Sequence, residues 1–187
     1  MVNLDTTEKI AQAIKDIKYR LNSMMAYDIY NYIFEKRKDN TGQTSIYQES
    51  HIIEPAFEIS IIFGRQLLDF LQIGHNKATG ELDNPLVYKK NTIKIDDLFL
   101  TSFTNISTLP LTDALVNSYD RQIKSIIKVA NKASAHMTFS HTTTQEFSDI
   151  QEIKPIIQDL CLKYVPGLNQ DNLWWFNKDE MKNAYIK

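Results

Sequence analysis

Residues 53–71, IEPAFEISIIFGRQLLDFL, carry apolar side chains on nearly every face of the helix that their spacing predicts. A helix of this kind is typically central and buried. Within a helix of roughly residues 49–71, Pro55 fits only in the first turn or at a kink, and Gly74 is expected to end it. Gly64 in its middle would let a neighbouring helix approach closely. This stretch therefore predicts a helical bundle built around one central helix.

Apolar residues at steps of three and four also predict helices on both sides of the central one. These helices are expected over residues 7–36, 96–103, 112–139 and 144–164. The pair Asn22-Ser23 can divide the first of them, and Pro155 predicts a break in the last. Residues 86–95, LVYKKNTIKI, alternate apolar and polar side chains and predict a small hairpin. The fold class is therefore all-α, a bundle of about five or six helices.

The composition of the 187-residue chain fits one soluble globular domain spanning residues 1–187, because 43% of the residues are hydrophobic and only 5 are glycine and 5 proline. A single cysteine favours a reducing compartment, and we expect a cytoplasmic protein. No apolar run is long enough for a membrane helix, and the first residues are acidic and polar, unlike a secretory signal. A net charge of −2 excludes a globally basic nucleic-acid binder and leaves a local basic face open.

One helix face carries such a local concentration of cations. Arg121, Lys124, Lys128, Lys132 and His136 recur at steps of three and four and form a strip beside the apolar seam of their helix. Phosphate would be attracted to that strip, so it is a candidate RNA-binding surface. The alternative is an ordinary solvated polar face.

Arg65 is a permanently charged residue in an otherwise apolar helix, where an unpaired charge would be costly. Asp69, one turn later, predicts a structural ion pair with Arg65. The alternative is that Asp69 holds Arg65 towards a polar pocket shared with Asn131, Lys132 and His136. In that pocket the ammonium of Lys132 would lower the pKa of the imidazole of His136 and favour its proton-accepting form.

Other candidate sites are weaker. His51, Glu54 and Glu58 share a helix face, but no second His/Glu set completes a bundle metal site, so we expect neither a metal nor another cofactor. Cys161 is interpreted as a core residue. The aromatic residues 174–176 are expected to dock onto the bundle, with an exposed partner-binding patch as the alternative.

Three segments together carry a resemblance to a known group of proteins. The segments RQLLDFL (65–71), Asp96-Asp97 and NKASAHMTF (131–139) resemble a family of uncharacterised bacterial proteins with an Arg-x-Leu-x-Asp-Phe helix and an Asn-Lys-x-x-Ala-His-Leu-Thr helix. That arrangement is similar to the HEPN helical domains, whose signature is an Arg, often followed by Asn, four to six residues before a His. The resemblance implies a HEPN-like bundle, a homodimer, and metal-independent RNA cleavage by the Arg and the His.

This chain departs from the HEPN signature at its Arg. Asn131 stands in the position of the Arg and Lys132 in that of the Asn, and an amide cannot neutralise the charge of a phosphorane as a guanidinium can. Lys132 or Arg65 would have to substitute, beside His136 as the base.

These observations predict an RNA-associated protein or degenerate ribonuclease of the bacterial defence or stress type. Its candidate catalytic residues are His136, Lys132, Asn131 and Arg65, and its candidate RNA-binding residues are Arg121, Lys124 and Lys128. We expect weak binding of single-stranded RNA and little or no cleavage. The alternative is a non-catalytic protein-interaction module in which Arg65, Asp69 and His136 merely satisfy one another. Whether the strip is open to solvent and whether Arg65 shares a cleft with His136 separate the two hypotheses.

Overall fold

The computed structural model describes residues 6–41, 49–83, 110–133, 142–170 and 173. Helices account for 79% of these residues, and the strands they contain form one small hairpin. The prediction of an all-α bundle is therefore confirmed. In the described ranges no helix combines the length and the apolar character that crossing a membrane requires.

Four parts of the sequence interpretation lie outside the described residues. They are the hairpin at 86–95, the helix at 96–103, the end of the fourth helix with His136, and the aromatic residues 174–176.

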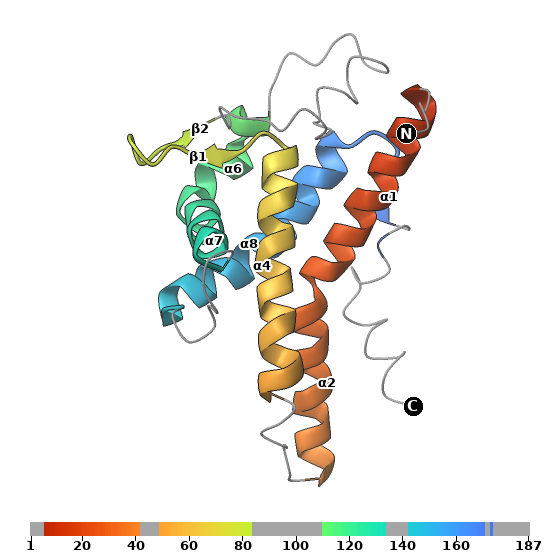
Figure 1. Cartoon of the computed structure of the whole chain (residues 1–187), viewed down its shortest axis with the longest axis vertical. Coiled ribbons are helices and arrows are strands. Elements are labelled where there is room, and N and C mark those ends of the chain that lie inside the picture. The colour runs from red at the N-terminus through yellow and green to blue at the C-terminus, as the bar shows by residue number, and fades with distance from the viewer. Residues whose placement is uncertain (1–5, 42–48, 84–109, 134–141, 171–172, 174–187) are drawn as a thin grey trace.

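The first predicted helix is divided in two, as expected. Helix α1 spans Thr6–Met24 and helix α2 spans Ala26–Thr41, with a turn at Met25 between them. Figure 1 shows the two following one another along one side of the central helix. The division lies slightly after Asn22-Ser23, and α2 continues to Thr41, five residues beyond the expected end at residue 36.

The central helix is α4, Glu54–Phe70, preceded by a π-helical turn η1, Glu49–Ile53. Pro55 lies in its first turn, as predicted, where a missing N–H costs no helical hydrogen bond. The helix ends at Phe70, one residue before the expected end at residue 71, but the residue that terminates it is Gln72 and not Gly74 as expected. Gln72 adopts the left-handed conformation (φ 59°), and Ile73 N–H donates to Leu68 O at 2.8 Å.

These bonds form a Schellman motif with glutamine at the position that glycine usually takes, and Gln72 N–H completes it by donating to Asp69 O at 3.1 Å. Gly74 instead opens the short hairpin of β1, Gly74–His75, and β2, Leu82–Asp83. Gly74 pairs with Asp83 and His75 with Leu82, in antiparallel register. Strands of two residues are too short to give an alternating sequence pattern, so the hairpin was not predicted.

The predicted helix over 112–139 is also divided. A 3₁₀ turn η2, Pro110–Thr112, precedes α6, Ala114–Ser118, and α7, Asp120–Ala133. Asp113 caps α6 by accepting a hydrogen bond from Leu115 N–H at 2.9 Å.

Helix α8 spans Thr144–Tyr164, as predicted, but runs without a break through Pro155. Residues on both sides of Pro155, such as Ile153 and Ile157, are fully buried, and their packing holds the helix together where proline removes a hydrogen bond. A capping box starts the helix, in which the Thr143 hydroxyl accepts from Glu146 N–H and Glu146 accepts from Thr143 N–H.

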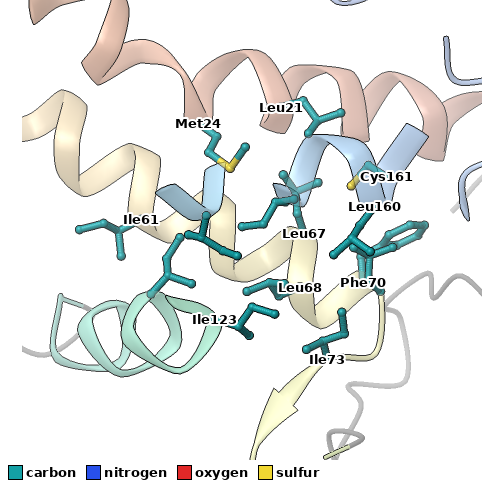
Figure 2. Packing of buried hydrophobic residues seen from close by; sticks show 14 of the residues in the cluster. Leu21, Met24, Ile61, Leu67, Leu68, Phe70, Ile73, Ile123, Leu160 and Cys161 are labelled. Carbon is teal, nitrogen blue, oxygen red and sulfur yellow. The ribbon is translucent and has the colours of Figure 1, made fainter. Parts of the chain in front are cut away.

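The core lies where α4 contacts α1, α2, α7 and α8. Figure 2 shows apolar side chains from α1, α7 and α8 meeting those of α4. Fully buried members include Leu21, Met24, Leu67, Leu68, Ile123, Leu160 and Cys161. The interpretation of Cys161 as a core residue is confirmed, and burial raises the pKa of its thiol. At the α2 end of the core, the rings of Tyr27, Phe57 and Phe147 lie with centroids 5.2 to 5.6 Å apart.

Gly64 is the point of closest approach to α4. A Cβ built on it would lie 2.5 Å from Cδ1 of Ile126 on α7, 3.4 Å from Sδ of Met24 and 3.6 Å from Cδ1 of Ile157. The absence of a side chain at Gly64 therefore lets helices from three directions pack against α4.

One side of α4 is not buried. Ile59 and Ile62 on α4 are 40% and 37% exposed, and Ile52 on the preceding turn η1 is 38% exposed, although the sequence pattern had indicated burial all round. In Figure 1 this helix has α1 and α2 on one side and α7 on the other, and α8 passes behind it.

Candidate functional site

The structure brings Arg65, Asp69 and Asn131 together between α4 and α7. Nε of Arg65 lies 3.5 Å from Oδ2 of Asp69, and Nη1 of Arg65 donates a hydrogen bond to Oδ1 of Asn131. The side chains of Arg65 and Asp69 are 34% and 42% exposed, so this ion pair lies at the rim of the core and not within it. Burial raises the pKa of Asp69 more than the guanidinium lowers it.

Arg65 is incompletely satisfied in this arrangement. Its Nε is buried and makes no hydrogen bond, because the contact with Asp69 is long and is an ion pair only. The guanidinium therefore links α4 to α7 through Nη1, whereas its ion pair with Asp69 stays within α4.

Lys132, the next residue after Asn131, pairs with α8 instead of with the Arg65 cluster. Its Nζ lies 3.7 Å from Oε1 of Glu146, and Nζ of Lys128 lies 3.3 Å from the same oxygen. The pocket predicted from the sequence is thus found in part. Arg65 contacts Asn131, whereas Lys132 contacts Glu146 on α8.

The cationic strip on α7 is paired with carboxylates along its described length. Nη2 of Arg121 lies 3.1 Å from Oδ1 of Asp149 on α8. Nζ of Lys124 lies 2.8 Å from Oδ2 of Asp120 and 3.4 Å from Oε2 of Glu81, next to strand β2. The hydrogen bond to Asp120 raises the pKa of Lys124.

The α8 carboxylates that meet the strip are themselves held in place. Asp149 is 1% exposed and accepts hydrogen bonds from the Ser125 hydroxyl at 2.7 Å and from Nε2 of Gln145 at 2.9 Å. Burial raises the pKa of Glu146, but the hydrogen bonds from Thr143 and Lys128 outweigh it and leave that pKa lowered. These carboxylates form a fixed anionic row facing α7.

The cations nevertheless remain at the surface. The side chains of Arg121, Lys128 and Lys132 are 65%, 61% and 47% exposed. The strip is therefore open to solvent and at the same time electrostatically compensated by α8.

Lys154 is a buried cation, with the same exposure as Asp149, that the sequence reasoning missed. It is 1% exposed, forms an ion pair with Asp28 on α2, and places Nζ 5.3 Å from the ring centroid of Tyr27. Burial lowers the pKa of Lys154, and Asp28 only partly offsets this. The signal was present, because Lys154 lies four residues after Ile150 and three before Ile157, on the apolar stripe of α8.

Asp113 forms a second polar cluster that was not predicted. Its Oδ2 accepts hydrogen bonds from Nζ of Lys163 at 2.6 Å and from the hydroxyl of Tyr164 at 2.7 Å. Burial and the bond to Asp113 raise the pKa of Tyr164 to about 12. The pKa of Asp113 is lowered, because its hydrogen bonds outweigh the effect of burial. The cluster fastens the start of α6 to the end of α8.

Across the described ranges, no three His, Cys, Asp or Glu side chains are placed to hold a metal ion, and this includes those around His51. No family model, curated protein or solved structure matches this chain. The HEPN resemblance therefore stays a prediction.

Proposed function

We propose that this chain is a non-catalytic protein-interaction module, in which the charged residues of α7 and the Arg65 cluster hold the bundle together. The observation that carries the proposal is that carboxylates of this chain pair with the cations of the strip. Its cations Arg121, Lys124, Lys128 and Lys132 meet the carboxylates Glu81, Asp120, Glu146 and Asp149.

Binding RNA would compete with these internal pairs. A phosphate that drew Arg121 away would leave the carboxylate of Asp149, which is 1% exposed, without its cation. Loss of one partner from a fully buried ion pair costs about 3–5 kcal/mol, and the cost here is smaller because water screens Arg121, which is 65% exposed. Affinity of proteins for a phosphate backbone arises from uncompensated cations, and four cations facing four carboxylates offer little net charge.

The second candidate is the RNA-associated protein or degenerate ribonuclease, with His136, Lys132 and Asn131 at its site. The exposure of Arg121 and Lys128 favours it, because both keep donors at the surface despite their pairing.

An RNA binding and cleavage assay separates the two candidates. Labelled single-stranded RNA would be incubated with the purified full chain in EDTA over a salt series, with fluorescence anisotropy for binding and a gel for cleavage. Lys128→Gln tests the strip, and Lys15→Gln is a matched control on the exposed face of α1. We expect no cleavage, and no binding that Lys128→Gln weakens more than Lys15→Gln does.

Two results would refute the proposed module. One is salt-dependent binding that Lys128→Gln abolishes and Lys15→Gln preserves. The other is cleavage that both His136→Ala and Lys132→Ala lose while their thermal melts stay unchanged.

A further inference from the structure

The uncovered side of α4 has the spacing of a helix-pairing surface. Ile59 and Ile62 lie three residues apart on α4 and are 40% and 37% exposed. We call these two residues the α4 stripe. Pro55 and Gln66 are also exposed and extend the series to 55, 59, 62 and 66, in alternating steps of four and three residues. Such steps are those by which one helix packs along another.

Charges of opposite sign flank the α4 stripe. Glu58 lies beside its first half and Arg65 beside its second, seven residues apart on the same edge of the helix. Arg65 binds Asp69 and Asn131 within its own chain, and a guanidinium with five donors can also donate to a further carboxylate.

From this arrangement, and resting on the proposed role as an interaction module, we propose that the α4 stripe packs antiparallel against the α4 stripe of a second copy of this chain. The two-fold axis passes between Ile59 and Ile62. Ile59 then lies opposite the partner subunit's Ile62, and Pro55 lies opposite the partner subunit's Gln66. Glu58 lies beside the partner subunit's Arg65.

Charge complementarity favours this occupant and this direction. Antiparallel packing brings the acidic half of this α4 edge against the basic half of the same edge of the other copy, whereas two-fold parallel packing would place these edges on opposite sides of the contact, where Glu58 could not meet the partner subunit's Arg65. A two-fold contact needs a patch that complements itself. The isoleucines of the α4 stripe can pack against their own copies, and the flanking Glu58 and Arg65 are of opposite charge. One helix face is small beside the roughly 800 Å² that a standard interface buries on each partner, so monomer and dimer should exchange with concentration.

The oligomeric state tests the surface. Light scattering and sedimentation would be measured on the full chain up to millimolar concentration, for the wild type and for Ile59→Gln combined with Ile62→Gln. Both isoleucines are exposed, so the double substitution should leave the fold intact, as thermal melts would check. Tyr30→Gln on α2, where Tyr30 is 42% exposed, is the matched control. We expect the wild type and Tyr30→Gln to approach twice the chain mass of 21.7 kDa, and the double variant to stay at that mass.

Disulfide trapping tests the direction. Pro55→Cys and Gln66→Cys would be purified separately and oxidised alone or mixed, and buried Cys161 should not interfere. In antiparallel packing, copies of the same residue lie about 16 Å apart along the axis, since eleven residues each rise about 1.5 Å. Unlike residues are level with one another, within reach of a disulfide. We expect cross-linked dimer only in the mixture.

Each remaining outcome overturns the inference. A wild type that is monomeric throughout, a double variant that still dimerises, or equal loss in Tyr30→Gln would remove the α4 stripe as the contact. Cross-linking of each variant alone would indicate parallel packing. A monomeric wild type without RNA activity defeats only this inference, whereas strip-dependent RNA binding or cleavage defeats the proposed function whatever the mass.

Discussion

Replacing Gly64 by alanine should destabilise the bundle, although alanine is the better helix former. The added Cβ would lie 2.5 Å from Cδ1 of Ile126, about 1 Å inside the usual 3.5–4.0 Å separation of carbon atoms. Ile126 is fully buried, and Met24 and Ile157 pack at the same point, so α4 cannot simply move away. The steric clash with Ile126 therefore outweighs the gain in helix propensity.

The magnitude follows from two opposing effects. Alanine gains about 1 kcal/mol of helix propensity over glycine, and overpacking a close-packed core costs about 1–3 kcal/mol. Since the clash meets a fully buried side chain, we expect the upper part of that range and a net loss of about 1–2 kcal/mol in the free energy of unfolding.

Ile126→Val provides the matched variant, because it removes the Cδ1 atom that the new Cβ would meet. Alone it should cost about 0.5–1.5 kcal/mol by leaving a small cavity. In the double variant the alanine methyl occupies that space, so Gly64→Ala should add no further loss and should recover stability through its helix propensity. Urea unfolding followed by circular dichroism would measure all four proteins. Losses that simply add, or a stabilising Gly64→Ala, would refute this account of the contact.

Three further predictions concern ionisable groups. Asp28→Ala should cost about 3–5 kcal/mol because it strands the ammonium of Lys154, whereas Lys154→Met should cost much less, since it leaves a carboxylate that is 32% exposed. Urea unfolding of both would be compared, and equal losses would contradict the pairing. The pKa of Tyr164 is raised to about 12, so its neutral hydroxyl stabilises the fold fully below about pH 10. This contribution to the free energy of unfolding, about 2–3 kcal/mol, is lost as pH rises to about 12. Tyr164→Phe should remove that alkaline loss in urea melts, and an identical loss in the variant would show that ionisation of Tyr164 is not its cause. The lowered pKa of Glu146 gives stability that is complete above its ordinary pKa and lost as pH falls through the folded value, so Glu146→Gln should flatten the acid limb of the stability curve while costing about 1 kcal/mol at neutral pH. An unchanged acid limb in that variant would contradict the contribution.

Helical periodicity was sufficient for the architecture but not for the interruptions. The bounds of α8 and the start of α4 at Pro55 follow from apolar spacing and from where proline is tolerated. The Schellman end at Gln72 was missed because glutamine rarely adopts the left-handed conformation, and nothing local in the sequence marks it. The continuous helix through Pro155 was missed because tertiary packing on both sides overrides a local breaking tendency.

For the candidate site, spacing along one helix was sufficient to predict the charged residues but not their partners on other helices. The contact of Arg65 with Asp69 is local and could be anticipated, as could the alignment of the α7 cations. Their pairing with Glu146 and Asp149 depends on how α7 and α8 are placed against one another, which no single-helix pattern contains. Lys154 was detectable as a charge on an apolar stripe, but Asp28 lies 126 residues away.

The central position of α4 sets how the bundle opens. Since α1, α2, α7 and α8 all contact α4, each of them loses part of its buried face once α4 detaches, although α7 and α8 keep their contacts with one another. Backbone amides in the middle of α4 should therefore exchange with solvent only through global unfolding. The hairpin of Gly74–His75 and Leu82–Asp83, with an exposed tip, can open without disturbing the core. The most protected amides are thus expected in α4, and the least protected ones in the hairpin that follows it.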